Sequence, residues 1–151
     1  MTSSPRFLFA ALLLLAGTLA AAQDRPQKLP SITLNAGMHL IQAEVAQTPE
    51  QRSIGLMFRS SMGTNEGMLF VGDEPGQRCF WMRYTLVPLT AAFIADDGTI
   101  VNLADMKPQT TDAHCSAQPV RYVLEMNKGW FVKKGIKAGS KLGGPFFEAR
   151  R

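Results

Sequence analysis

The stretch from Leu89 to Met106, LTAAFIADDGTIVNLADM, most strongly limits how this chain can fold. Apolar runs flank Asp97-Gly98, a pair that suits the tight turn of a β-hairpin, so two adjacent antiparallel strands are expected here. Further short apolar or alternating runs, separated by turn residues, cover 31–36, 38–46, 67–71, 79–88 and 120–126. Many short strands and glycine turns predict a mainly β fold, an antiparallel sandwich or barrel.

One segment, TPEQRSIGLMFR, breaks this alternation and predicts a short helix over residues 49–58. Thr48 suits the N-cap, Pro49 suits the first helical position, and Gln51 completes a capping box. The helix should cover one end or one face of the sheet. Its spacing predicts two stripes of side chains. The core-facing stripe is Ile54, Met57 and Phe58, and the second stripe is Arg52, Leu56 and Arg59.

The N-terminus has the pattern of a secretory signal peptide. Arg6 precedes an apolar run that starts at Phe7, and three alanines ending at Ala22 supply the small residues of a cleavage site. A retained membrane anchor is the alternative, but the run is shorter than the roughly 20 residues of a spanning helix. We therefore expect a signal peptide at 1–22, a flexible segment at 23–30, and a single β-rich domain at 31–151 in a periplasmic or secreted protein.

Charge argues against a nucleic-acid partner. The net charge of the whole chain is +4, acids and bases are interspersed, and the longest basic cluster is the short VKKGIKAGSK. A chain of this length, once the leader is removed, is long enough to bury one core of its own.

The chain has two cysteines, Cys79 and Cys115. In an oxidising compartment they can form a disulfide, which the chain-entropy model values at roughly 4 kcal/mol of stability. Two buried thiols or one reactive thiol are the alternatives, and the sequence leaves all three open.

Five motifs between about Ala43 and Leu142 occur in a characteristic order: TPEQRSIGLMFR, GMLFV, FWMRYTLVPLTAAFIADDGTI, MKP and PVRYVLEMNKGW. Together they resemble the family called domain of unknown function 192. The resemblance implies a small, mainly β, jelly-roll-like domain, often exported, without an established biochemical activity. Two positions depart from the family pattern, because Tyr84 stands where Asn is usual and Thr90 stands where Asp is usual.

Candidate catalytic and metal-binding residues are sparse. His39 and His114 lie far apart without an HxH or HExxH pattern, so neither a metal site nor another cofactor is predicted. The scattered methionines favour core packing over a soft-metal site. His114-Cys115 is an adjacent pair with nucleophilic potential, which leaves a hydrolytic or thiol-dependent enzyme as the alternative function. A fold could gather Glu66, Asp105 and Glu125 for sugar chemistry, although no spacing requires it.

The stretch CFWMRYTLVP, residues 79–88, concentrates aromatic, cationic and sulfur-containing side chains. If it forms a strand, alternation divides it into a core face and an opposite face. The core face is Phe80, Met82, Tyr84 and Leu86, and the opposite face is Cys79, Trp81, Arg83 and Thr85.

The leading hypothesis is a binding module rather than a standalone enzyme. A helix packed near the aromatic stretch would form a cationic, aromatic-lined surface for a small anionic or sugar-like ligand or an envelope component. Solvated helix charges are the alternative explanation for the arginines. The predicted ligand-binding residues are Arg52, Met57, Arg59, Trp81, Arg83 and Thr85.

Overall fold

The computed structural model describes residues 25–147, so the predicted signal peptide at 1–22 lies outside the described residues. The strands are β1 (Ser31–Ala36), β2 (His39–Ala46), β3 (Glu66–Gly76), β4 (Cys79–Phe80), β5 (Leu89–Ile94), β6 (Ile100–Met106), β7 (His114–Cys115), β8 (Val120–Asn127) and β9 (Leu142–Gly143). The helices are α1 (Pro49–Ile54) and α2 (Trp130–Lys133). The mainly β fold is confirmed, although α2 adds a second short helix to the one that was predicted.

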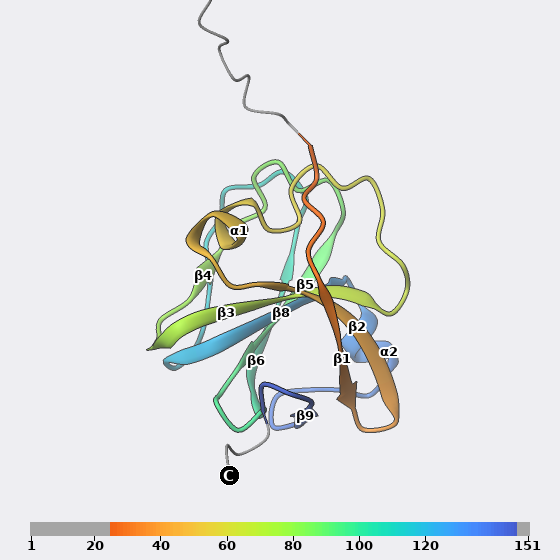
Figure 1. Ribbon diagram of the computed structural model, residues 1–151, viewed down its shortest axis with the longest axis vertical. Helices are drawn as coiled ribbons and strands as arrows, with labels where there is room; N and C mark the ends of the chain where they lie inside the picture. Colours follow the sequence, from red (N-terminus) through yellow and green to blue (C-terminus); the bar gives the residue numbers. More distant parts are fainter. Residues whose placement is uncertain (1–24, 148–151) are drawn as a thin grey trace, which may run out of the picture.

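Seven strands form one curled, half-barrel sheet in the order β6-β5-β8-β3-β2-β1-β9 (Figure 1). Strands β4 and β7 form a separate two-stranded sheet. The prediction of a wholly antiparallel arrangement is wrong at one place, because β2 and β3 pair in parallel. Helix α1 and the loop after it lie between these two strands, and a crossover of this kind returns the chain to run in the same direction.

The predicted hairpin over residues 89–106 is confirmed. Strands β5 and β6 pair antiparallel, with Leu89 opposite Met106. Gly98 in the turn has φ 86°, and a Cβ atom there would collide with the carbonyl oxygen of Leu142. This glycine therefore allows both the turn and the close approach of β9.

Apolar side chains are buried on both faces of the large sheet. Along β3, Leu69 belongs to one core cluster, whereas Met68 and Phe70 belong to the other. Along β8, Leu124 and Val123 divide in the same way. The middle of the sheet is thus covered on both sides, and a polar residue placed there becomes buried whichever face it takes.

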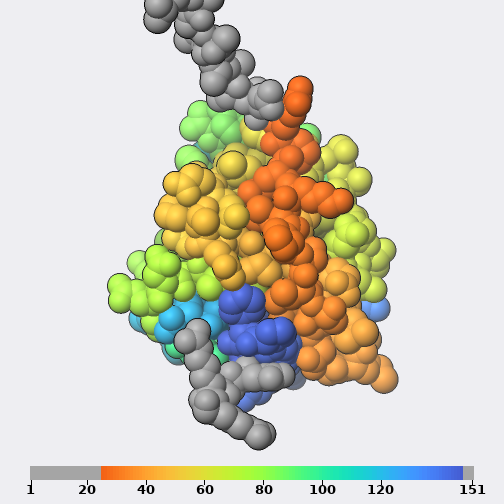
Figure 2. Space-filling view, viewed as in Figure 1, coloured from red at the N-terminus to blue at the C-terminus, as the bar shows by residue number. Residues whose placement is uncertain are grey.

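Residues 25–30 run extended beside α1, and Figure 2 shows this segment, in orange, next to the yellow helix region. The Gln27 side-chain amide donates to the carbonyl oxygens of Gln51 and Gly55, at 2.8 and 2.9 Å. The backbone N–H of Leu29 donates to the carboxylate of Glu44 at 2.7 Å. Gln27 and Leu29 are therefore bonded to the domain, and the flexibility expected for residues 23–30 stays a prediction.

Helix α1 begins as predicted and ends earlier. Thr48 caps it and forms the capping box with Gln51, but the helix stops at Ile54 because Gly55 takes φ 50°. The predicted core-facing stripe is wrong for Ile54, which is 38% exposed, while Leu56 from the second stripe is 2% exposed. The early stop changes which residues after Gly55 turn toward the sheet.

The alternation predicted for residues 79–88 holds as far as Arg83, with Met82 buried and Trp81 exposed, and is wrong from Tyr84 on. Only Cys79 and Phe80 belong to a strand, and the rest forms a loop in which Tyr84 has φ 58°. Tyr84 and Leu86 from the predicted core face are 48% and 45% exposed. Thr85 from the opposite face is buried, because the turn at Tyr84 reverses the order of the two faces.

Cys79 and Cys115 form a disulfide, which decides between the alternatives that the sequence left open. The two residues face each other in the β4–β7 pair, and their sulfur atoms are 2.08 Å apart. Cys115 therefore has no free thiol to act as a resting nucleophile. No helix within residues 25–147 is long and apolar enough to cross a bilayer.

Candidate ligand-binding cavity at Glu125

Glu125 occupies the centre of the sheet. It lies on β8, opposite Met68 of β3 on one side and Ala91 of β5 on the other. It shares a face with Val123, the face covered by α1, the loop after it and the loop that follows β4. Glu125 is only 4% exposed, and its neighbour on β5, Ala91, has a small side chain.

A small cavity, here named the Glu125 cavity, lies against this residue and has a volume of about 40 Å³. One water molecule needs roughly 15 Å³, whereas a site for a drug-sized molecule has at least about 300 Å³. The cavity can therefore admit one small polar group of a larger molecule. It is lined by Arg52, Ser53, Ile54, Gly55, Leu56, Met57, Phe70, Phe80, Trp81, Thr85 and Glu125.

Two buried polar groups of the cavity lack partners. Neither the carboxyl group of Glu125 nor the hydroxyl group of Thr85 forms a hydrogen bond with any residue in the described range 25–147. Burial raises the pKa of Glu125 to about 8. At neutral pH the group is therefore mainly a neutral carboxylic acid, which can donate one hydrogen bond and accept others.

Trp81 joins the cavity to the surface, since it lines the cavity and is 48% exposed. Arg52 lines the same cavity, but its guanidinium donates to the carbonyl oxygens of Gln47 and Val71 and lies 3.5 Å from the carboxylate of Asp73. Arg52 thus braces the wall between α1 and the end of β3. The guanidinium has few donors left for a ligand.

Three aromatic rings and one guanidinium form a stack beside the mouth of the cavity, here named the Arg83 stack. The rings of Phe58 and Tyr84 are stacked with centroids 5.6 Å apart. The Arg83 guanidinium lies 4.9 Å from the Tyr84 ring and 5.8 Å from the Trp81 ring. Because Trp81 also lines the cavity, the stack and the cavity form one continuous region.

Three loops contribute unusual backbone conformations that meet around the loop after β4. The non-glycine residues with positive φ in the described chain are Phe58, Tyr84 and Gln109. The N–H of Phe58 donates to the carbonyl oxygen of Tyr84 at 2.9 Å, and the N–H of Gln109 donates to those of Met82 and Thr85 at 3.0 and 3.1 Å. Such strain persists where surrounding contacts enforce it, and it is concentrated at functional sites in many proteins.

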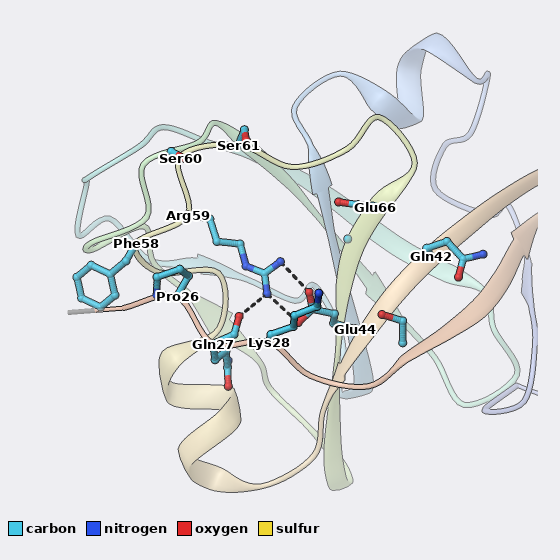
Figure 3. A pocket seen from close by; sticks show the side chains of 12 residues that line it. Pro26, Gln27, Lys28, Gln42, Glu44, Phe58, Arg59, Ser60, Ser61 and Glu66 are labelled. Atoms are coloured by element: carbon cyan, nitrogen blue, oxygen red, sulfur yellow. Dashed lines mark hydrogen bonds and ion pairs between the residues drawn. The ribbon is translucent and has the colours of Figure 1, made fainter. Parts of the chain in front are cut away.

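Arg59 lines a separate hollow, drawn in Figure 3, which borders the Arg83 stack at Phe58. Its guanidinium holds the carboxylate of Glu44 with two hydrogen bonds of 2.8 and 2.7 Å and donates to the carbonyl oxygen of Gln27 at 2.8 Å. Burial raises the pKa of Glu44, but the hydrogen bonds from Arg59 and Leu29 and the charges of Arg59 and Lys28 outweigh it and leave this pKa below its ordinary value. The hollow, about 540 Å³ in volume, is therefore built around an ion pair in which both terminal nitrogens of Arg59 are bonded, while its buried Nε has no hydrogen-bond partner within residues 25–147.

The structure brings most of the predicted ligand-binding residues together. Arg52, Met57, Trp81 and Thr85 line the Glu125 cavity, Arg83 stands beside its mouth, and Arg59 does not contribute to it. Whether these residues bind a ligand stays a prediction. Sequence reasoning missed the central position of Glu125, since no local pattern shows that both faces of β8 are covered.

The three carboxylates that were considered for sugar chemistry in the sequence do not come together in one site. Glu66 lines the hollow beside Arg59, and Asp105 accepts a hydrogen bond of 2.6 Å from the hydroxyl of Thr90. His114 pairs with Phe80 in the β4–β7 sheet and does not line the Glu125 cavity. Within residues 25–147, no three His, Cys, Asp or Glu side chains are grouped so that they could hold a metal ion.

The fold and the site define a small, mainly β domain with a curled sheet and a buried polar cavity. A family model described as an Uncharacterized ACR, DUF192, matches residues 32–144, and the chain belongs to this family. Among curated proteins there is no match.

Two solved structures are similar to this chain. A Sinorhizobium meliloti 1021 protein described as a "putative transcription regulator" is 37% identical, with a TM-score of 0.70 over 74% of this chain and 90% of that one. A protein of unknown function from Novosphingobium aromaticivorans DSM 12444 is 32% identical, with a TM-score of 0.74 over 82% of this chain and 94% of that one.

The two departures from the family pattern have visible structural settings. Tyr84 has φ 58°, a conformation that Asn tolerates better than Tyr, so the Asn that is usual there would relieve strain. Thr90 pairs with Asp105 on the neighbouring strand, and this pair keeps a carboxylate near the position where Asp is usual.

Proposed function

We propose that this protein is a binding module for a small sugar-like ligand. One observation carries the proposal: Glu125 and Thr85, buried and without hydrogen-bond partners, line a small cavity whose mouth holds the exposed ring of Trp81. Among the described residues, the oxygens of these two side chains are not fully buried atoms, so they are open to the cavity and can form hydrogen bonds with a ligand group that enters it.

A sugar has the two features that such a site selects. Its C–H face is apolar and can pack on the Trp81 ring, while one hydroxyl group is small enough to enter a cavity of about 40 Å³. A hydroxyl both donates and accepts, as does the neutral carboxylic acid of Glu125. The cavity would take one hydroxyl, and the rest of the ligand would lie on the surface.

Binding explains these features better than catalysis does. Glycoside hydrolysis generally uses two carboxyl groups about 5–10 Å apart, and Glu125 is the only carboxyl group among the residues that line the cavity. The thiol-dependent alternative needs a free Cys115, which is bonded to Cys79.

We also propose that the protein acts in the periplasm or outside the cell. The signal-peptide pattern of residues 1–22 supports export, and the Cys79–Cys115 disulfide suits an oxidising compartment. An envelope glycan or a soluble sugar would both be accessible there.

The test is an NMR titration of ¹⁵N-labelled protein with neutral monosaccharides and their short oligomers. We expect shift changes at residues 55–57, 80–85 and 125, and at least about tenfold weaker binding for Trp81→Ala and Glu125→Leu, as expected for the loss of 1.4 kcal/mol or more. Glu74→Leu, a change at an exposed glutamate in the turn-rich end of β3, is the matched control and should leave affinity unchanged. Shift changes elsewhere, or equal affinity in all variants, would refute the proposal.

A further inference from the structure

Arg83 differs from the arginines that build the fold. The guanidinium groups of Arg52, Arg59, Arg78 and Arg121 all donate hydrogen bonds to carbonyl or carboxylate oxygens. Arg83 forms neither a hydrogen bond nor an ion pair with any residue in the described part of the chain. Its hydrogen-bond donors are therefore all available to a ligand.

The Arg83 stack nevertheless restricts where this guanidinium lies. The Tyr84 and Trp81 ring centroids lie 4.9 and 5.8 Å from it, and the Phe58 ring stacks on Tyr84. A cation held over ring faces loses less freedom when it binds, and its planar edge stays open. Such an edge matches the two oxygens of a carboxylate, which it can bind with two parallel hydrogen bonds.

The position of the stack connects Arg83 with the proposed sugar site. Trp81 takes part in both, with its ring near the Arg83 guanidinium and its side chain in the wall of the Glu125 cavity. A ring-shaped ligand packed on the part of the Trp81 ring that Arg83 leaves open would have the guanidinium at one edge and the cavity at another. No carboxylate pairs with Arg83 within residues 25–147, so an acidic ligand would meet no competing partner there.

We propose that the ligand is an acidic sugar, with its ring on Trp81, one hydroxyl in the Glu125 cavity and its carboxylate on Arg83. This inference rests on the proposed function and adds to it the chemical class of the ligand and a specificity-determining residue. Arg83 selects for the acid, whereas the cavity and Trp81 bind acidic and neutral sugars alike.

The experiment compares D-glucuronate with D-glucose, which differ by a carboxylate in place of a hydroxymethyl group. Affinities are measured by NMR titration for the wild-type protein, Arg83→Gln and the control Arg121→Gln, whose arginine pairs with Asp96 and does not line the Glu125 cavity. We expect the wild type to bind glucuronate at least about tenfold more tightly than glucose, corresponding to 1.4 kcal/mol. Arg83→Gln should bring the ratio of the glucuronate and glucose affinities close to one, and Arg121→Gln should keep the wild-type ratio.

The outcomes separate this inference from the proposed function. If glucose and glucuronate bind the wild type equally well at the Glu125 cavity, the inference is wrong and the proposed function stands. A preference for glucuronate that survives in Arg83→Gln also overturns the inference. Binding of neither sugar, nor of their short oligomers, overturns both.

Discussion

At the scale of single residues, Glu125 makes the stability of the domain depend on pH. Burial raises its pKa from 4.5 to about 8, so between these values the folded protein keeps a proton that the unfolded chain releases. The free energy of unfolding must therefore fall as the pH rises from about 4.5 to about 8, by up to a few kcal/mol from this group. Glu125→Gln should remove this slope, because an amide stays neutral throughout.

Urea unfolding at about pH 5, 7 and 8.5 measures the effect. The wild-type protein should lose stability relative to Glu125→Gln as the pH rises, and the difference between the two proteins should be largest at the highest pH. Glu74→Gln, at an exposed position, is the control and should follow the wild type. Parallel pH profiles for wild type and Glu125→Gln would show that Glu125 is ionised in the folded protein.

Arg59 should be the most costly of the predicted site arginines to remove, although it does not line the Glu125 cavity. Its side chain and that of Glu44 are only 14% and 13% exposed, and Arg59→Ala leaves this carboxylate without its partner. We expect a loss of roughly 2–4 kcal/mol in the free energy of unfolding near neutral pH. Arg83→Ala removes only exposed contacts and should cost less than about 1 kcal/mol.

The lowered pKa of Glu44 provides a second measurement on the same variant. A carboxyl group with a lowered pKa stabilises the fold above its ordinary pKa, and this contribution disappears as the pH falls through the folded-state value. When the pH is lowered from about 5 to about 3, the free energy of unfolding should therefore fall less for Arg59→Ala than for the wild type. Equal stability of Arg59→Ala and wild type at neutral pH would contradict the structural role given to this pair.

At the scale of elements, the disulfide links β4 to β7 in the short sheet, and its residue Cys79 lies two positions before Trp81. The sequence separation of 36 residues corresponds to roughly 4 kcal/mol of stability in the chain-entropy model. Cys79→Ser/Cys115→Ser should lower the free energy of unfolding by about that amount and weaken sugar binding through a looser loop at 81–88. Thermal unfolding with and without reductant tests this. The Tm of the wild type should fall in reductant, and the Tm of the double variant should stay the same.

Local patterns predicted the elements that local interactions form. The hairpin at Gly98 and the capping box at Thr48 depend on residues close in sequence, and both were found as expected. The loop after β4 could not be predicted, because Tyr84 takes its positive φ in a turn that Phe58 and Gln109 bind from outside. The parallel pairing of β2 with β3 likewise depends on a long-range crossover.

At the scale of the whole molecule, the site exists only because distant segments meet over β8. Helix α1 and the residues after it form one wall, the loop after β4 forms another, and Glu125 lies between them at the sheet. The sequence suggested that the helix and the aromatic stretch would meet, and it supplied Arg52, Met57, Trp81 and Thr85 as candidates. Glu125 was named only as one of three acids for sugar chemistry, and its buried central position could not be predicted, because burial of both faces of β8 is a property of the complete fold.

A crystal structure after soaking with D-glucuronate tests the central claim most directly. The account predicts density for a sugar ring on the face of Trp81, with one hydroxyl inside the Glu125 cavity and the carboxylate at Arg83. The same soak of Glu125→Leu should show that density weakened or lost. Density in the hollow at Arg59, or an unliganded Trp81 under conditions where NMR detects binding, would contradict the account.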